Sequence, residues 1–127
     1  MQARHEDLVA WQRAMKLAEE IDRVTQEFPS DERFGMVAQM RPTGASAHSN
    51  IAEGHGKATA SEFGSAMGHA RGPLCELRTQ LKLATHLGFF VESDHAACID
   101  EADQVGRLIS GLIAPKAQAR ERLTSDA

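Results

Sequence analysis

Apolar residues recur every three or four positions along four stretches of this chain, which is the spacing of one face of an α-helix. Prolines, glycines and small polar residues separate the stretches, as they do where one helix ends and the next begins. The pattern predicts helices over about residues 7–27, 31–54, 61–86 and 93–114. Because these helices have similar lengths and short connections, the predicted fold is all-α, an antiparallel up-down-up-down four-helix bundle.

The fourth helix is expected to end at Pro115, because a proline cannot continue the hydrogen-bond ladder of a helix. A bundle domain is therefore assigned to residues 1–115, and the polar tail 116–127 is expected to fray. A chain of 127 residues agrees with one domain, since it can bury about two-thirds of the surface that its unfolded form exposes.

Pro42 and Pro73 lie inside the second and third helices. Each helix is expected to be kinked there, and the second to continue as one helix, because its apolar spacing resumes in phase beyond the proline. The two prolines are equally distant from the turn at residues 57–58, so the kinks are expected to face each other at one level. Packing of the two kinks is the favoured interpretation, and a ligand cleft is the alternative. The small residues near this level are Gly44, Ala45, Gly68 and Gly72.

The amino-acid composition indicates a globular protein without a membrane-spanning segment. Hydrophobic residues make up 42% and charged residues 25%, which is typical of a globular chain. The first residues do not form a signal peptide, and no apolar run approaches the about 20 residues that span a bilayer, so no membrane association is expected. Cys75 and Cys98 lack the CxxC spacing, which favours free, buried thiols in a reducing cytoplasm.

The net charge of −4 is spread unevenly along the chain. Residues 33–82 carry six basic and three acidic side chains, whereas the segments before and after them are both acidic. Three interpretations stay open: a solvated surface with chance asymmetry, complementary faces of two subunits, and a local site for an anionic partner.

The apolar stripe of the fourth helix is wider than one bundle core needs. It includes Leu108, Ile109, Leu112 and Ile113, and the segment 89–91 adds an apolar corner. A homo-oligomer is therefore expected.

A polar cluster lies at the end of the second helix. Asn50 and Glu53 are three residues apart and share a face near the helix C-terminus, where the helix dipole disfavours a carboxylate. Lys57, Arg71 or a neighbouring subunit is expected to compensate the charge of Glu53. The favoured interpretation is a structural clasp that bonds the turn and the adjacent helix end, and the alternative is a polar ligand pocket formed by Asn50, Glu53 and His55. The clasp comprises Ser49, Asn50, Glu53, Gly54 and His55.

Catalysis and metal binding have little support in the sequence. His48 and His55 are seven residues apart, whereas helical metal pairs are usually three or four apart. Cys75 and His69 are six apart, which places them on different faces of a helix. No catalytic residue, metal ligand or cofactor is assigned, and the chain is expected not to be an enzyme.

Nucleic-acid binding would depend on five basic residues without interleaved aromatic side chains. Contact with phosphates is therefore the expected mode, and an oligomer would multiply a weak patch into a usable one. The five residues are Arg41, Lys57, Arg71, Arg78 and Lys82.

Several short motifs occur together in a characteristic order. They are Asp7–Ala14, Phe28–Pro29, Phe34–Gly35, Gln39–Arg41, Ser49–Gly54, Glu76–Leu77 and Leu87–Phe89. Together they resemble the four-helix-bundle family named after 23S rRNA-intervening sequences, over about residues 6–113. The Ser-Asn-Ile-Ala-Glu-Gly run at residues 49–54 is the most specific of these motifs.

The resemblance implies a small up-down bundle that assembles as a pentameric ring, with no settled biochemical activity. The family is also similar to the accessory protein of diversity-generating retroelements, which implies RNA, DNA or a nucleic-acid enzyme as candidate partners. The chain departs from the family pattern at Pro42, which replaces a basic residue, and at Ala47, His48 and Pro73. The lost basic residue and the acidic net charge both weaken a nucleic-acid role.

The sequence thus favours a non-enzymatic, homo-oligomeric interaction or scaffold protein of the cytoplasm, with weak RNA or DNA binding through a basic surface. The alternative is a helical bundle that binds a small ligand or a metal.

Overall fold

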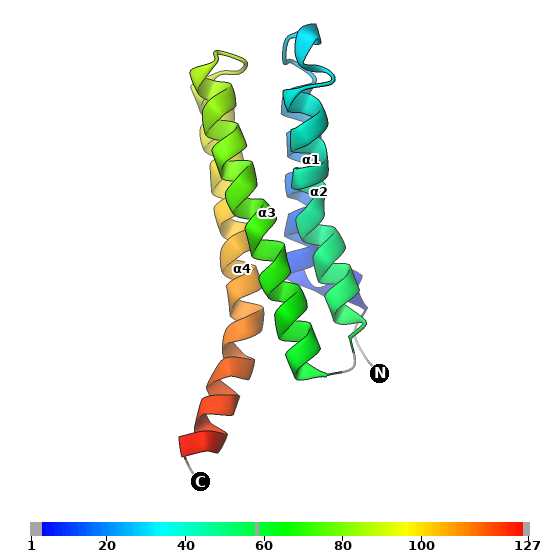
Figure 1. Cartoon of the computed structure of the whole chain (residues 1–127), viewed down its shortest axis with the longest axis vertical. Helices are drawn as coiled ribbons and strands as arrows, with labels where there is room; N and C mark the ends of the chain where they lie inside the picture. Colours follow the sequence, from blue (N-terminus) through cyan, green and yellow to red (C-terminus); the bar gives the residue numbers. More distant parts are fainter. Residues whose placement is uncertain (1–3, 58, 126–127) are drawn as a thin grey trace.

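The computed structural model describes residues 4–57 and 59–125, with side chains described up to Ile113. Four long helices dominate these residues, and no strand occurs among them (Figure 1). The two short 3-10 helices are η1 (His5–Asp7) and η2 (Ser30–Glu32), and the long helices are α1 (Val9–Thr25), α2 (Met36–His55), α3 (Ala60–His86) and α4 (Glu92–Ser125). The predicted all-α four-helix bundle is confirmed.

Successive helices run in opposite directions, as their side-chain contacts show. Arg71 of α3 contacts Ser110 of α4, and Arg78, further along α3, contacts Asp103, which comes earlier in α4. The same reversal relates α1 and α4, where Arg13 contacts Gln104 and Arg23, later in α1, lies 3.7 Å from Asp94, earlier in α4. α1 and α4 are also packed together, so the four helices close a ring around one core (Figure 1).

Each helix contributes one apolar face to that core. The buried positions within a helix are three or four residues apart, so a single stripe points inward. None of the helices among the described residues is long and apolar enough to cross a bilayer. The fully buried, larger side chains are Leu17, Ile21, Val24, Met40, Ile51, Met67, Leu77, Leu81, Cys98, Val105 and Ile109.

The α4 stripe is largely used inside the bundle. Ile109 is fully buried, and Leu108, Leu112 and Ile113 are partly buried against the core. Phe89 and Phe90 pack on Phe28 at the far end, with ring centroids 5.6 and 5.4 Å from it. The α4 side chains therefore leave less free apolar surface than the sequence pattern indicated, and the two phenylalanines before α4 are also packed.

The predicted end of the fourth helix at Pro115 is wrong, since α4 continues to Ser125. An interior proline removes one backbone hydrogen bond, and the residues after it include strong helix formers such as alanine, glutamine, arginine and glutamate. Residues 126–127 of the predicted tail lie outside the described residues. The division into a bundle domain at 1–115 and a tail at 116–127 stays a prediction.

Helices α2 and α3 both continue through their prolines, and the kinks at Pro42 and Pro73 stay a prediction. The two prolines do not share a level, however. Gly54, near the end of α2, lies against Ala66 and Met67, which are more than one turn inside α3. The first turn of α3 therefore extends beyond the end of α2 (Figure 1).

The remaining contacts between these helices agree with this offset. Thr43, beside Pro42, is level with Gln80, whose amide lies 3.5 Å from the Thr43 hydroxyl. Pro73 lies seven residues before Gln80, about two turns away. The expectation of facing prolines is therefore wrong, because it assumed a symmetric turn.

Two glycines of α2 allow this helix to approach its neighbours closely. A Cβ atom at Gly54 would lie 2.8 Å from the Cβ of Ala66 and 2.7 Å from the Cε of Met67, closer than carbon atoms can pack. A Cβ at Gly44 would lie 3.2 Å from the Cβ of Ile21 in α1. Gly44 thus serves the contact with α1 and not the predicted contact with α3. No described atom lies within 4 Å of a Cβ at Gly68, so this glycine makes no close approach to the part of the chain that the structure describes.

We expect Gly54→Ala to destabilise the protein and Gly68→Ala to stabilise it. Overpacking at Gly54 costs about 1–3 kcal/mol, which outweighs the up to about 1 kcal/mol gained by replacing a helical glycine. Gly68 offers only the gain, since no atom of the described residues lies within 4 Å of the position that its Cβ would occupy. Urea unfolding of both variants would measure the two free-energy changes, and equal signs would contradict this account.

Candidate functional site

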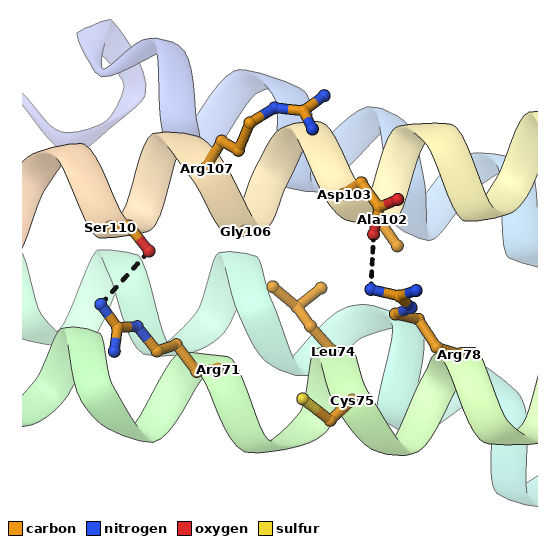
Figure 2. Close-up of a pocket in the computed structure, with 9 residues that line it drawn as sticks. All are labelled: Arg71, Leu74, Cys75, Arg78, Ala102, Asp103, Gly106, Arg107 and Ser110. Carbon is orange, nitrogen blue, oxygen red and sulfur yellow. Dashed lines mark hydrogen bonds and ion pairs between the residues drawn. The ribbon is translucent and has the colours of Figure 1, made fainter.

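A groove with a volume of 630 Å³ lies between α3 and α4. Its α3 side carries side chains at helical spacing on one face, and its α4 side carries those that the antiparallel register brings opposite (Figure 2). It is lined by Arg71, Leu74, Cys75, Arg78, Ala102, Asp103, Gly106, Arg107 and Ser110.

The floor of the groove is apolar. Leu74 and Ala102 are buried and continue into the core. Gly106 lies at the middle of the α4 side and has no side chain to fill the space above them (Figure 2). Cys75 borders the same central space, and the prediction that its thiol is buried is wrong, because its position on α3 faces the groove and not the core. The groove therefore has an open, apolar middle.

Basic side chains lie toward the two ends of the groove. A guanidinium nitrogen of Arg71 donates to the hydroxyl of Ser110 at 3.2 Å. Arg78 forms an ion pair with Asp103 at 2.8 Å (Figure 2). Arg71 thus has a neutral partner and keeps its charge available, whereas the charge of Arg78 is shared with a carboxylate. Both pairs are largely exposed to solvent, so they are individually weak.

Arg107 is a third cation at this site. Its side chain extends along α4 and away from Arg71 and Arg78 (Figure 2). It also lines a smaller hollow between α1 and α4, together with Arg13 and Leu108. No ion pair joins Arg107 to any residue whose side chain the structure describes. Arg107 was not predicted as a site residue, although it lies as far after the turn near residue 89 as Arg71 lies before it.

The structure separates the five basic residues predicted for nucleic-acid binding. Arg71 and Arg78 line the groove, and the exposed Lys82 follows one turn later on the same helix. Arg41 instead holds α1 to α2, because its Nε donates to the Thr25 hydroxyl at 3.0 Å and lies 3.2 Å from the Asp22 carboxylate.

Lys57 also lies outside the groove. Its Nζ is 3.8 Å from the carboxylate of Glu53, one turn earlier at the end of α2. Lys57 was among the partners expected to compensate Glu53, and this pair does so, although both side chains are largely exposed.

The predicted clasp makes most of its hydrogen bonds within α2. The hydroxyl of Ser49 donates to the Ala45 carbonyl at 3.1 Å, and the amide of Asn50 donates to the Ser46 carbonyl at 2.9 Å. These bonds reach one turn back along the helix, as short polar side chains often do. They differ from the expected bonds across to the adjacent helix, which Gly54 contacts directly.

His55 turns toward the N-terminal end of the chain. Its ring centroid lies 6.3 Å from that of His5 in η1, and His5 lies 5.3 Å from Trp11 in α1. The carboxylate of Glu6 lies 3.0 Å from the Nε2 of His5. The end of α2 is therefore held to the start of the chain by an aromatic cluster that the sequence did not indicate.

A second hollow, of 460 Å³, lies between the end of α2 and the start of α3. It brings Asn50 and Glu53 together with Lys57 and His69, whereas His55 is not part of its lining. His48 is half-buried in α2, and this burial lowers the pKa of its imidazole. Among the described residues, no three His, Cys, Asp or Glu side chains are grouped as a metal site would need.

Comparison with known proteins gives the family. A family model described as 23S rRNA-intervening sequence protein matches residues 6–111. The chain belongs to this family. No curated protein matches the sequence.

A solved structure supports the fold of this 23S rRNA-intervening sequence family member. It is that of a protein of unknown function from the S23 ribosomal protein family of Bacteroides thetaiotaomicron, with a TM-score of 0.77. The two share 17% sequence identity, and the match covers 84% of this chain and 96% of the other. At this identity the likeness shows the shared bundle.

The two cysteines should differ sharply in reactivity. Cys75 is exposed in the groove, whereas Cys98 is fully buried in α4, and burial raises the pKa of the Cys98 thiol to about 12. Since a thiol reacts as its thiolate, a raised pKa slows alkylation. At about pH 8 we expect iodoacetamide to modify Cys75 in the folded protein and Cys98 only in denaturant. Peptide mass spectrometry reads both sites, and equal labelling of the folded protein would contradict an open groove.

Proposed function

We propose that this protein is a non-enzymatic, homo-oligomeric interaction module of the cytoplasm that binds RNA or DNA phosphates through the α3–α4 groove. The observation that carries the proposal is the gathering of Arg71 and Arg78 along one face of α3, in a groove that Arg107 of α4 also lines, although its side chain points away from theirs (Figure 2). Phosphate oxygens are the partners that guanidinium groups bind best.

The groove favours contact with the backbone over recognition of bases. No aromatic side chain is among its lining residues, so stacking platforms of the kind used by single-strand binding proteins are missing from it. Cys75 has no histidine beside it in this lining to act as a base. A lining of basic and apolar side chains without a nucleophile and base supports an interaction role over a catalytic one.

One copy offers only a few cations, and the net charge of the chain is −4. Binding by a single copy is therefore expected to be weak and sensitive to salt. Self-association would align several grooves on one assembly, and a long nucleic acid could then contact more than one of them. Under the proposal, self-association therefore strengthens nucleic-acid binding.

Replacing both groove arginines tests the binding. We expect Arg71→Gln/Arg78→Gln to weaken binding of a labelled oligonucleotide and to reduce the slope of log affinity against log salt by about 0.7 for each lost phosphate contact. Lys16→Gln/Arg33→Gln is the matched control, since it removes the same charge from α1 and the α1–α2 connection. Fluorescence anisotropy between about 50 and 200 mM salt gives both quantities.

Two results would contradict the nucleic-acid proposal. The first is no binding by the native protein at low salt, and the second is an equal loss in both double variants. Binding should also be unaffected by chelators. A thermal shift with a metal ion or metabolite, unchanged by the groove variants, would instead support the small-ligand alternative at the 460 Å³ hollow.

The exposed apolar side chains favour a self-association surface at the end of α3. Leu83 and Leu87 are one turn apart and 49% and 54% exposed, and Val91 follows at 62%. Exposed apolar side chains clustered in this way are typical of protein interfaces. We therefore assign self-association to this surface and not to the α4 stripe, which packs mainly into the core of the bundle.

We expect the native protein to have several times the 13.8 kDa mass of one chain at micromolar concentration. Leu83→Glu/Leu87→Glu should reduce the mass to that of one chain, because charges resist burial in an interface. Thr79→Glu is the control, since it adds a carboxylate at an exposed position of the same helix without removing apolar surface. Multi-angle light scattering gives the masses, and a native monomer would contradict self-association.

A further inference from the structure

The α3–α4 groove alternates in chemical character along its length. Arg71, beside Ser110, marks one end, and Arg78, beside Asp103, marks the other. The two arginines are seven residues apart on α3, which separates their Cα atoms by about 10 Å along the helix axis. Between them lies the open middle above Leu74, bordered by Gly106 (Figure 2). A ligand along this groove meets a cation, an apolar hollow and a second cation.

A nucleic-acid strand alternates in the same way, with a charged phosphate on each side of an uncharged nucleoside. The volume of 630 Å³ lies in the range of about 300–1,000 Å³ that is usual for small-molecule sites. We propose that the groove binds single-stranded nucleic acid by taking one unpaired nucleoside into its middle, with the flanking phosphates on Arg71 and Arg78. This inference rests on the proposed nucleic-acid function and specifies the ligand of the same site.

The shape of the site predicts a preference for single-stranded nucleic acid over a duplex. In a duplex each base is paired and stacked inside the helix, so a whole nucleoside cannot enter a surface hollow without base flipping. An unpaired nucleoside can leave the stack and cover apolar surface such as that of Leu74. Since no aromatic ring lines the groove, the nucleoside is held by its apolar contact area, and little preference among bases is expected.

The two ends of the site are unequal. Arg71 can turn to a phosphate by giving up one hydrogen bond to a hydroxyl. Arg78 must share or exchange the carboxylate of Asp103, and the exposed fractions of these two side chains, 46% and 32%, make that exchange easy. Asp103 therefore weakens one phosphate position and leaves the Arg71 position the stronger.

Gly106 is the residue that keeps the hollow open. A Cβ atom at this position would lie 3.9 Å from Leu74 Cδ1, an ordinary van der Waals distance. A larger side chain therefore fits on the helix without a clash at its first atom and occupies the middle of the groove. The arginines at the two ends would keep their positions and charges.

Gly106→Leu tests the proposal, with Gly111→Leu as the matched control. Gly111 is an exposed glycine of the same helix with no described atom within 4 Å of its Cβ position, and it is not among the residues that line the groove. The probes are a labelled oligouridylate, the equivalent oligodeoxythymidylate and a duplex of the same length. Anisotropy titration gives the affinities, and thermal unfolding checks that both variants are folded.

We expect the native protein to prefer both single strands over the duplex, and Gly106→Leu to lower single-strand affinity about tenfold through loss of apolar contact. Gly111→Leu should leave it unchanged, and duplex binding should change in neither variant. Equal single-strand affinity in the native protein and Gly106→Leu would overturn the nucleoside site. If Arg71→Gln/Arg78→Gln still weakened binding in that case, phosphate binding would stand. A preference for RNA over DNA would assign a contact to the 2′-hydroxyl within the same site.

Discussion

The close approach of the α2 backbone to its neighbours is the contact on which the rest of the structure depends. At Gly54 the helix touches Ala66 and Met67 of α3, and at Gly44 it touches Ile21 of α1. A Cβ at Gly54 would force the helices apart, and one at Gly44 would press against Ile21, so these two positions limit how far α2 can slide along each partner. The residues that line the α3–α4 groove face each other only in one register of these two helices. That register depends on how all four helices pack around the core.

Polar contacts on the surface form where the register brings two side chains together, and they contribute little to setting that register. The pairs Arg78–Asp103 and Arg41–Asp22 are exposed to solvent, where ion pairs contribute little to stability. They nevertheless decide which cations remain available. Arg41 is held by Asp22 and Thr25, whereas Arg71 has only the hydroxyl of Ser110 among the side chains that the structure describes. Whether a basic residue is available to a ligand therefore depends on the side chains of the helix that packs against it.

Glycines serve two opposite purposes in this bundle. Gly54 is buried under a neighbouring helix, where the missing side chain allows contact. Gly106 lies beside a space that no side chain fills, and the missing side chain there leaves a groove. The shared bundle fold extends to a protein with 17% sequence identity, but a groove of this kind depends on individual side chains. The function proposed above therefore rests on the residues of this chain and not on its fold.

The sequence by itself determined the number of helices, the inward face of each and the family, because apolar spacing and local motifs are properties of short segments. It also determined that α2 continues through Pro42, since the apolar stripe stays in phase there. It did not determine the end of α4, where helix propensity after Pro115 outweighed one lost hydrogen bond. Only the tertiary structure decided the offset of α3 past α2, the separation of Arg41 from Arg71, and the meeting of Arg107 with the groove. Each of these depends on the register between helices, and that register is set by how side chains from distant segments fit together.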